Sequence, residues 1–270
     1  MIFNNNSKVI SFRYDIPKNE ECKRFHIPER NEKVRKSVVN IDNAIFYTKA
    51  LGNYRMINEL IGSHLAHKLD LDTVDYEIGK TSTGLHALSK PFYEEGYQYA
   101  FFKDYFHLSN YPRRTILYRL NPFSSFCRTE GLDLLRDTEM YESALKLTAI
   151  DLKMGQVDRH SGNLQVKYDD TSVSFAPIYD YSESYLMGDA YPIYRSSLIF
   201  IRKNRASIEE LIRRHPELLE YLSYLLSLSI DEILTEIGDE KDIEFTGDEM
   251  MRYTKSQRLI ERPFQKINKS

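Results

Sequence analysis

The sequence uses very little cysteine: Cys22 and Cys127 are its only two, and they lie too far apart to form a Cys-x-x-Cys pair. A structural zinc site is therefore not expected, and such sparse use is typical of proteins in a reducing cytosol. No apolar run approaches the roughly 20 residues that a membrane-spanning helix needs. The first six residues lack the basic and apolar segments of a signal peptide. We therefore expect a soluble, cytoplasmic protein with no membrane partner.

Three familiar catalytic signatures are also missing. The chain has no Gly-x-x-x-x-Gly-Lys-Ser/Thr phosphate loop, no His-Glu-x-x-His pair and no nucleophile elbow. Residues 79–82, Gly-Lys-Thr-Ser, resemble the end of a phosphate loop but lack the glycine that should precede it. These absences argue against P-loop nucleotide hydrolysis, zinc proteolysis of that type and acyl transfer by an α/β-hydrolase.

The composition is that of a globular protein. Hydrophobic residues make up 41% and charged residues 29% of the 270 residues, which is enough chain for one large domain or two small lobes. The formal net charge of −3 argues against nucleic acid as a main partner, because phosphate backbones require a basic face.

The first third of the chain has a strand-rich pattern. Residues 1–36 are polar and mixed, and are compatible with either an irregular arm or an edge strand. Residues 38–47 form two β-favouring runs around Asp42-Asn43, which predicts a hairpin whose second strand ends at Lys49. Apolar residues at helical spacing predict a helix over residues 53–69, and strands are expected over 72–78 and 85–88. No glycine occurs between Pro28 and Lys49.

After Pro91 the pattern is mainly helical. Residues 131–152 predict one long amphipathic helix, followed by two short strands over 163–167 and 173–178. From Ser207 onward we expect helices, the first starting at Ser207 with an acidic first turn, with breaks at Gly238 and Gly247. The predicted fold class is therefore α+β: a small β-rich part with one helix, followed by a larger helical part.

The most informative stretch is residues 156–163, Gln-Val-Asp-Arg-His-Ser-Gly-Asn, followed by residues 178–182, Ile-Tyr-Asp-Tyr-Ser. This spacing is typical of phosphoryl-transfer enzymes, in which one carboxylate meets the attacking hydroxyl while an amide oxygen and a second carboxylate hold Mg²⁺. We predict the first role for Asp158 and metal ligation by Asn163 and Asp180, which supply the hard oxygen atoms that Mg²⁺ prefers. The alternative is that Asp158 only stabilises a turn beside Ser161-Gly162.

Two further charged residues suit this chemistry. Lys49 lies near the end of a predicted strand and Glu59 lies on the helix that follows. In kinases such a lysine neutralises ATP phosphate charge and the glutamate fixes its position. Considered alone, both could be ordinary surface charges. For Arg159 and His160 we expect architectural roles, with Arg159 pairing with a nearby carboxylate.

Three segments together resemble the HipA-like serine/threonine kinases, a bacterial family whose catalytic loop is similar to that of phosphatidylinositol kinases. They are residues 58–69, 156–163 and 176–184. The resemblance implies a two-lobed, protein-kinase-like fold, with an N-terminal arm over 1–36, an N-lobe over 37–91 and a C-lobe over 92–270. It also implies ATP and Mg²⁺ as cofactors. Residues 88–92, Leu-Ser-Lys-Pro-Phe, would form the hinge that binds adenine, with Ser89 and Lys90 as binding residues.

The function that this resemblance implies is phosphorylation of Ser or Thr on a protein substrate, in a toxin or effector that regulates growth, with an antitoxin or regulatory protein as a further partner. The chain departs from the family in two places: larger members carry an additional N-terminal subdomain, and their phosphate-covering loop usually contains glycines. Residues 40–43 would form that loop here, unless the cover is supplied otherwise. Two alternatives stay open, namely a pseudokinase that binds nucleotide or a partner, and a kinase of lipids or small molecules.

Overall fold

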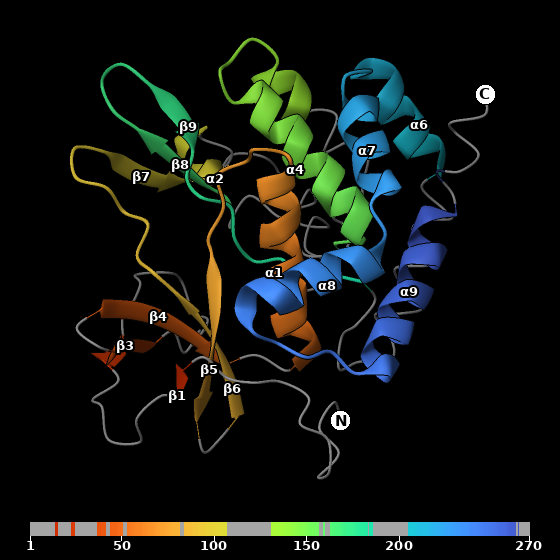
Figure 1. The fold of residues 1–270 in the computed structure, drawn as a ribbon. Helices are drawn as coiled ribbons and strands as arrows, with labels where there is room; N and C mark the ends of the chain where they lie inside the picture. The colour runs from red at the N-terminus through yellow and green to blue at the C-terminus, as the bar shows by residue number, and fades with distance from the viewer. Residues whose placement is uncertain are drawn as a thin grey trace.

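The computed structural model describes residues 14–15, 23–24, 37–41, 44–50, 53–81, 84–106, 131–156, 159, 163–182, 184–185, 205–262 and 264. Two sheets and a group of helices surround the helix α1 (Asn53–Lys68), which lies between the larger sheet and the helices (Figure 1). The α+β arrangement agrees with the predicted one. No helix within the described part of the chain is long and apolar enough to cross a membrane.

The larger sheet has six strands in the order β1-β5-β6-β4-β3-β2. Their bounds are β1 Tyr14–Asp15, β2 Lys23–Arg24, β3 Ser37–Ile41, β4 Ala44–Ala50, β5 Tyr76–Thr81 and β6 Gly84–Ser89. The strands β1 and β2 come from the region expected to be an arm or an edge strand, and they occupy the two edges of the sheet. β1 pairs with β5 in parallel, whereas the other pairings are antiparallel.

The predicted hairpin is formed by β3 and β4. Their pairing runs to the end of β3, where Ile41 lies opposite Ala44, and Asn40 lies opposite Ile45. Asn40 and Ile41 are therefore strand residues and not part of a phosphate-covering loop. Residues 42–43, which join the strands, lie outside the described residues. So does the longer connection between β2 and β3, residues 25–36.

The helix α1 is buried along most of its length because it has neighbours on several sides. It contacts β5 and β6 on one side and the helices α4 (Tyr141–Met154) and α8 (Ile230–Lys241) on the others. Its apolar residues form part of the main core, and among them are Met56, Ile57, Leu60, Ile61 and Leu65. Two polar residues in the same helix, Asn58 and Glu59, are also fully buried. Buried polar groups need hydrogen-bond partners, so these two positions call for an explanation.

A smaller, three-stranded sheet lies beside the helices in the order β7-β8-β9, with bounds Gln98–Phe101, Gln165–Tyr168 and Val173–Phe175. The short helix α2 (Phe102–Tyr105) follows β7. Beyond β9, Ile178 forms a parallel bridge with Thr73, whose hydroxyl also donates to the Ile178 carbonyl at 2.9 Å. This bridge ties the segment that leads to Asp180 to the segment between α1 and β5.

The predicted long helix over residues 131–152 is interrupted. Residues 131–135 are helical, turns follow, and α4 begins only at Tyr141. Thr138 accounts for the break: its hydroxyl donates to the Leu135 carbonyl and accepts from the Met140 amide, at 2.8 and 3.3 Å. Such local side-chain bonds give the backbone an alternative to continuing the helix.

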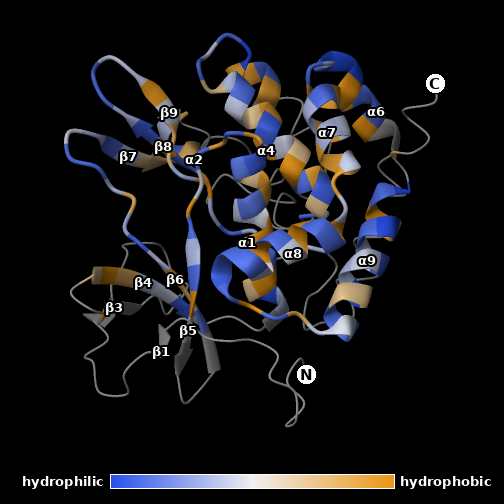
Figure 2. Ribbon diagram, viewed as in Figure 1, coloured by the Kyte–Doolittle hydropathy of each residue, from blue (hydrophilic) through white to orange (hydrophobic). Residues whose placement is uncertain are grey.

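The remaining helices are α6 (Arg205–Arg214), α7 (Leu218–Ser227), α8 and α9 (Gly247–Glu261). Along α7 and α8, polar and apolar residues alternate in the manner of helices with one buried face (Figure 2). In α4, by contrast, all residues from Leu147 to Met154 are buried. The helix α6 begins at Arg205, two residues before the predicted start at Ser207. Capping boxes begin α8 and α9, with Ser229 and Glu232 in one and Thr246 and Glu249 in the other.

Gly238 does not break a helix, contrary to the prediction, but lies inside α8. Its role is steric: a Cβ at this position would come within 2.8 Å of the Ile243 carbonyl oxygen, where the chain folds back after the helix. The amide of Ile243 donates to the Gly238 carbonyl at 2.9 Å, which completes that turn.

The helix α9 is attached to α4 through a buried ion pair. The Lys153 ammonium, which is fully buried, lies 2.5 Å from the Glu261 carboxylate and donates to the Leu228 carbonyl at 2.9 Å. Burial lowers the pKa of Lys153, and Glu261 counteracts this effect only in part. The end of α4, which leads to the predicted catalytic loop, is thus held by a residue of α9.

Gly62 of α1 lies where this helix closely approaches Tyr181, in the segment that follows Asp180. A Cβ at position 62 would lie only 2.1–2.6 Å from atoms of Tyr181 at the base of its side chain, which cannot swing aside. We predict that Gly62→Ala lowers the free energy of unfolding by about 1–3 kcal/mol, the usual cost of overpacking. Urea unfolding measures this, with Gly247→Ala as control because its Cβ would meet open space. Equal stability of Gly62→Ala and the wild type would contradict the prediction.

Candidate functional site

Three charged residues that are distant in the sequence meet between the larger sheet and the helices. The Lys49 ammonium, on β4, lies 2.8 Å from Asp180 Oδ1 and 3.6 Å from Glu59 Oε1. Glu59 is fully buried, whereas the side chains of Lys49 and Asp180 keep 31% and 26% of their exposure. One cation thus bridges two carboxylates at a position that solvent can reach.

The charges at this site shift one another's ionisation. Burial raises the pKa of Glu59 to about 7, and Lys49 only partly offsets this. For Asp180, burial also acts to raise the pKa, but the attraction of Lys49 prevails and the pKa falls to about 2. Burial acts to lower the pKa of Lys49, and the two carboxylates outweigh it, so the pKa is raised. Lys49 and Asp180 are therefore both charged at neutral pH.

The backbone around Asp180 is held from several sides. Asp180 itself has a left-handed conformation, with φ of 67°, which non-glycine residues seldom adopt. Gln156 donates to the Asp180 carbonyl at 2.8 Å, and the next amide, that of Tyr181, donates to Glu59 Oε2 at 2.8 Å. Such a strained residue persists only where its surroundings fix it, as they do here.

Arg159 supports the same segment from the predicted catalytic loop. Its guanidinium donates to the Tyr179 carbonyl at 2.5 Å, pairs with the buried Asp151 carboxylate at 3.3 Å, and lies 4.9 Å from the centre of the Tyr181 ring. The pKa of Arg159 is raised: burial acts against the charge, but Asp151 more than compensates. Arg159 thus pairs with a carboxylate, as expected from the sequence.

The other predicted site residues occupy different positions. Asn163 is buried two residues before β8. Asp158 and His160 lie outside the described residues. Ser89 is the last residue of β6, two positions along from Ala87, which pairs with Lys49. Lys90 follows and is exposed.

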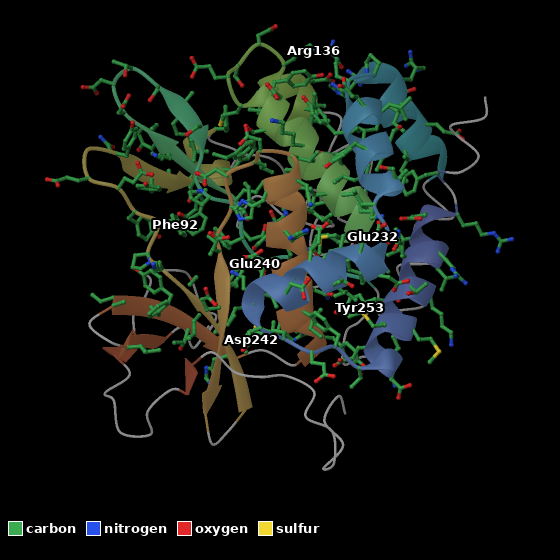
Figure 3. The ribbon with its side chains drawn as sticks, in the orientation of Figure 1. Phe92, Arg136, Glu232, Glu240, Asp242 and Tyr253 are labelled. Atoms are coloured by element: carbon green, nitrogen blue, oxygen red, sulfur yellow. The ribbon has the colours of Figure 1, made fainter. Side chains whose placement is uncertain are left out.

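The segment after Lys90 connects the two sheets and contacts the residue that precedes Asp180. Phe92, labelled in Figure 3, lies in this connection, and its ring stacks on that of Tyr179 with the ring centres 6.2 Å apart. Since Tyr179 directly precedes Asp180, the predicted hinge and the Asp180 segment are neighbours.

The donor set suits Mg²⁺ bound together with a nucleotide. The hydrogen bonds that Asp180 accepts on its carboxylate come from Lys49 and from the Ser182 hydroxyl, and both reach Oδ1. The described residues contain no group of three or more His, Cys, Asp or Glu side chains able to hold a metal ion. Mg²⁺ commonly uses one or two protein carboxylates and completes its shell with phosphate oxygens and water, so this arrangement fits.

Sequence reasoning assigned no role to several residues that shape the site. Gln156 and Asn58 were part of the family-like segments, yet hydrogen-bond partners far along the chain cannot be read from spacing. Tyr253 of α9 donates to Asn58, 195 residues earlier in the chain. The only signal was indirect: a polar residue, Asn58, between the apolar positions Ile57 and Leu60 of a helix.

Comparison with known proteins supports the fold but not a family. No protein-family model matches the sequence, and the curated proteins searched gave no significant match. Among solved structures, the proinflammatory kinase CtkA of Helicobacter pylori is similar over 94% of this chain and 96% of its own, with a TM-score of 0.58 and 13% sequence identity. HipA of Shewanella oneidensis, solved with HipB and operator DNA, has a TM-score of 0.49 and 14% identity, over 82% of this chain and 57% of that one.

The likeness to CtkA extends over nearly the whole of both chains, so this protein has a kinase-like α+β fold. The prediction of that fold from the sequence is confirmed. At 13% identity the likeness concerns the fold alone.

The raised pKa of Glu59 predicts a pH-dependent stability. Between about pH 4.5 and 7 the unfolded chain loses the Glu59 proton while the folded protein retains it, so stability falls as the pH rises. At about 1.4 kcal/mol per pKa unit the loss amounts to roughly 3 kcal/mol. The variant Glu59→Gln cannot titrate and should lack this component. Urea unfolding of both proteins from about pH 5 to 7.5 checks it; parallel curves would contradict it.

Proposed function

We propose that this protein is an ATP- and Mg²⁺-dependent kinase that phosphorylates Ser or Thr on a protein substrate. The observation that carries the proposal is the ion-paired group of Lys49, Glu59 and Asp180, brought together from β4, α1 and the segment after β9. The kinase-like fold gives this group a suitable setting. In kinases a lysine held by a helix glutamate, beside a metal-binding aspartate, is what the transfer requires.

Lys49 would neutralise the phosphates of ATP. Glu59 of α1, whose carboxylate lies 3.6 Å from the Lys49 ammonium, would hold Lys49 in place. Asp180, through the carboxylate oxygen that Lys49 does not contact, would hold Mg²⁺ together with Asn163. Bound Mg²⁺ supplies charge neutralisation at the transferred phosphoryl group. The partial exposure of Lys49 and Asp180 leaves them accessible to a nucleotide.

Asp158 would orient the acceptor hydroxyl and take its proton. Gln156 and Arg159, which flank it in the sequence, both bind the backbone beside Asp180, which supports placing Asp158 at the same site. Ser89 and Lys90 would form the hinge that binds adenine. This assignment divides the chain into an arm over 1–36, an N-lobe over 37–91 and a C-lobe over 92–270.

The nature of the acceptor rests on the resemblance of the sequence to HipA-like kinases. That resemblance favours a cytoplasmic toxin or effector that regulates growth by phosphorylating a protein, with an antitoxin or regulatory protein as its partner. The resemblance is carried by residues 58–69, 156–163 and 176–184. No direct role for nucleic acid is proposed.

The variant Asp158→Asn tests the proton acceptor. The amide cannot accept the proton, so we expect the rate of phosphate transfer to fall by about 10²–10⁴-fold, the usual contribution of a positioned general base. Incubation with radiolabelled ATP followed by mass spectrometry of the labelled protein measures this. Asp170→Asn, in the exposed turn between β8 and β9, is a matched control and should retain activity. Equal label transfer by Asp158→Asn and the wild type would rule out the role of Asp158.

The variant Asp180→Ala tests the metal site. This variant lacks the carboxylate proposed to hold Mg²⁺, so we expect no phosphate transfer at any Mg²⁺ concentration. Asp170→Ala should give the same Mg²⁺ titration as the wild type. Phosphate found on Ser or Thr of the wild type, but not of Asp180→Ala, would support the proposal. Thermal stabilisation by ATP without any transfer would indicate a pseudokinase instead. Transfer only to a lipid or small molecule would indicate the other alternative.

A further inference from the structure

We propose that Asn58 is a positioning residue that sets the metal-binding segment on α1, and that Tyr253 of α9 fixes Asn58 in the orientation this requires. The inference rests on the proposed function, because it assigns the segment around Asp180 to Mg²⁺. It adds a second residue of α1, besides Glu59, that holds this segment, and it connects the site to α9.

The hydrogen bonds of Asn58 account for its burial. Its side-chain amide nitrogen donates to the Ser182 carbonyl at 2.9 Å and to the Ser184 carbonyl at 2.8 Å. Its side-chain oxygen accepts from the Tyr253 hydroxyl at 2.9 Å. Both N–H donors and the acceptor are therefore used, so this fully buried group carries no unmet polar atom.

These partners make asparagine specific at this position. Two backbone carbonyls require two N–H donors, and a hydroxyl that donates requires an acceptor on the same side chain. Aspartate could accept from Tyr253 but would place a carboxylate oxygen against the two carbonyls. Leucine would leave all three partners without a bond in a dry environment, which is the costly outcome.

A short chain of bonds connects Asn58 to the proposed metal ligand. Asn58 holds the carbonyl of Ser182, and the hydroxyl of the same serine donates to Asp180 Oδ1 at 3.1 Å. On the other side, Glu59 accepts from the amide of Tyr181 at 2.8 Å. Two adjacent residues of α1 therefore hold backbone groups of three residues that follow Asp180, namely Tyr181, Ser182 and Ser184.

Tyr253 reaches this network from α9, on the side of that helix that faces α8 and α1 (Figure 3). Its side chain is fully buried, and its ring meets that of Tyr185 edge to face with the centres 5.4 Å apart. The hydroxyl also lies 3.2 Å from the Tyr54 carbonyl in the first turn of α1. The Tyr185 end of the segment and the start of α1 thus both contact one residue of α9.

The test compares Asn58→Asp and Tyr253→Phe with a matched control, Thr254→Val. The control also removes a hydroxyl from α9, but one that bonds Asp231 of α8 instead of the site. The first readout needs no nucleotide: hydrogen exchange of the amides in residues 178–185. The second is the Mg²⁺ concentration for half-maximal phosphate transfer at fixed ATP. Thermal unfolding records any general loss of stability.

We expect faster exchange confined to residues 178–185 in both variants, and an Mg²⁺ requirement raised by about tenfold in Asn58→Asp and a few-fold in Tyr253→Phe, in proportion to the hydrogen bonds lost. Thr254→Val should change neither. If Asn58→Asp fails to fold, Tyr253→Phe decides, because it keeps the buried ring.

The outcomes separate this inference from the proposed function. Local loosening of residues 178–185 in a protein whose wild type transfers no phosphate would uphold the hold on the segment and reject the kinase activity. An active wild type whose variants show unchanged exchange and an unchanged Mg²⁺ requirement would overturn the inference. Uniformly faster exchange with a lower melting temperature and the same Mg²⁺ requirement would also overturn it, since Asn58 would then be merely structural.

Discussion

The burial of Asn58 and Glu59 within α1 is the constraint on which the site depends. A polar side chain without exposure must find partners, and these two find theirs on the segment that follows Asp180 and on Lys49. As a result, the helix, the sheet and the Asp180 segment cannot be positioned independently. Glycine at position 62 belongs to the same constraint, because only the absence of a Cβ lets the base of Tyr181 lie against the helix.

The charges impose a second condition on the same place. Lys49 is shared between a carboxylate that burial makes hard to ionise and one that stays ionised well below neutral pH. The ammonium lies closer to Asp180, at 2.8 Å, than to Glu59, at 3.6 Å. A ligand with its own negative charge would compete with Asp180 for Lys49, and a divalent cation would replace Lys49 beside Asp180. An anion and a cation bound together would therefore satisfy the site better than either alone.

Much of the fold followed from patterns that are local. The apolar spacing of α1 and the β-favouring runs of β3 and β4 are strong local signals, and the order of elements was correct from β3 to β6. The strand expected over 72–78 lies later, at Tyr76–Thr81, so it includes part of the turn expected over 79–84. Two helix predictions were wrong for local reasons. The hydroxyl of Thr138 bonds the backbone and interrupts the helix before α4. Gly238 lies inside α8 and not at its end, because a Cβ there would meet the carbonyl oxygen of Ile243. The starts of α8 and α9 could have been predicted from the sequence, because a Glu follows Ser229 and Thr246 after three residues in each case.

The site was predictable in a different degree for each residue. The meeting of Lys49, Glu59 and Asp180 could be expected because their spacing matches a known arrangement, whereas the bonds of Asn58 and Gln156 could not. Those bonds go to backbone carbonyls, which every residue possesses, so no pattern of residue types reveals them. The link to Tyr253 spans most of the chain and depends entirely on how α9 packs.

The buried pair between Lys153 and Glu261 bears on how the protein is made. A lysine that is fully enclosed needs its carboxylate, and an uncompensated charge in such a place costs several kcal/mol. During synthesis, α9 leaves the ribosome after every other described helix and strand. Until then α4 has no counter-charge at its end, and Asn58 has no hydroxyl to accept from. In a growing chain the residues of every other described element are therefore synthesised first, and the contacts by which α9 holds α4 and α1 can form only afterwards.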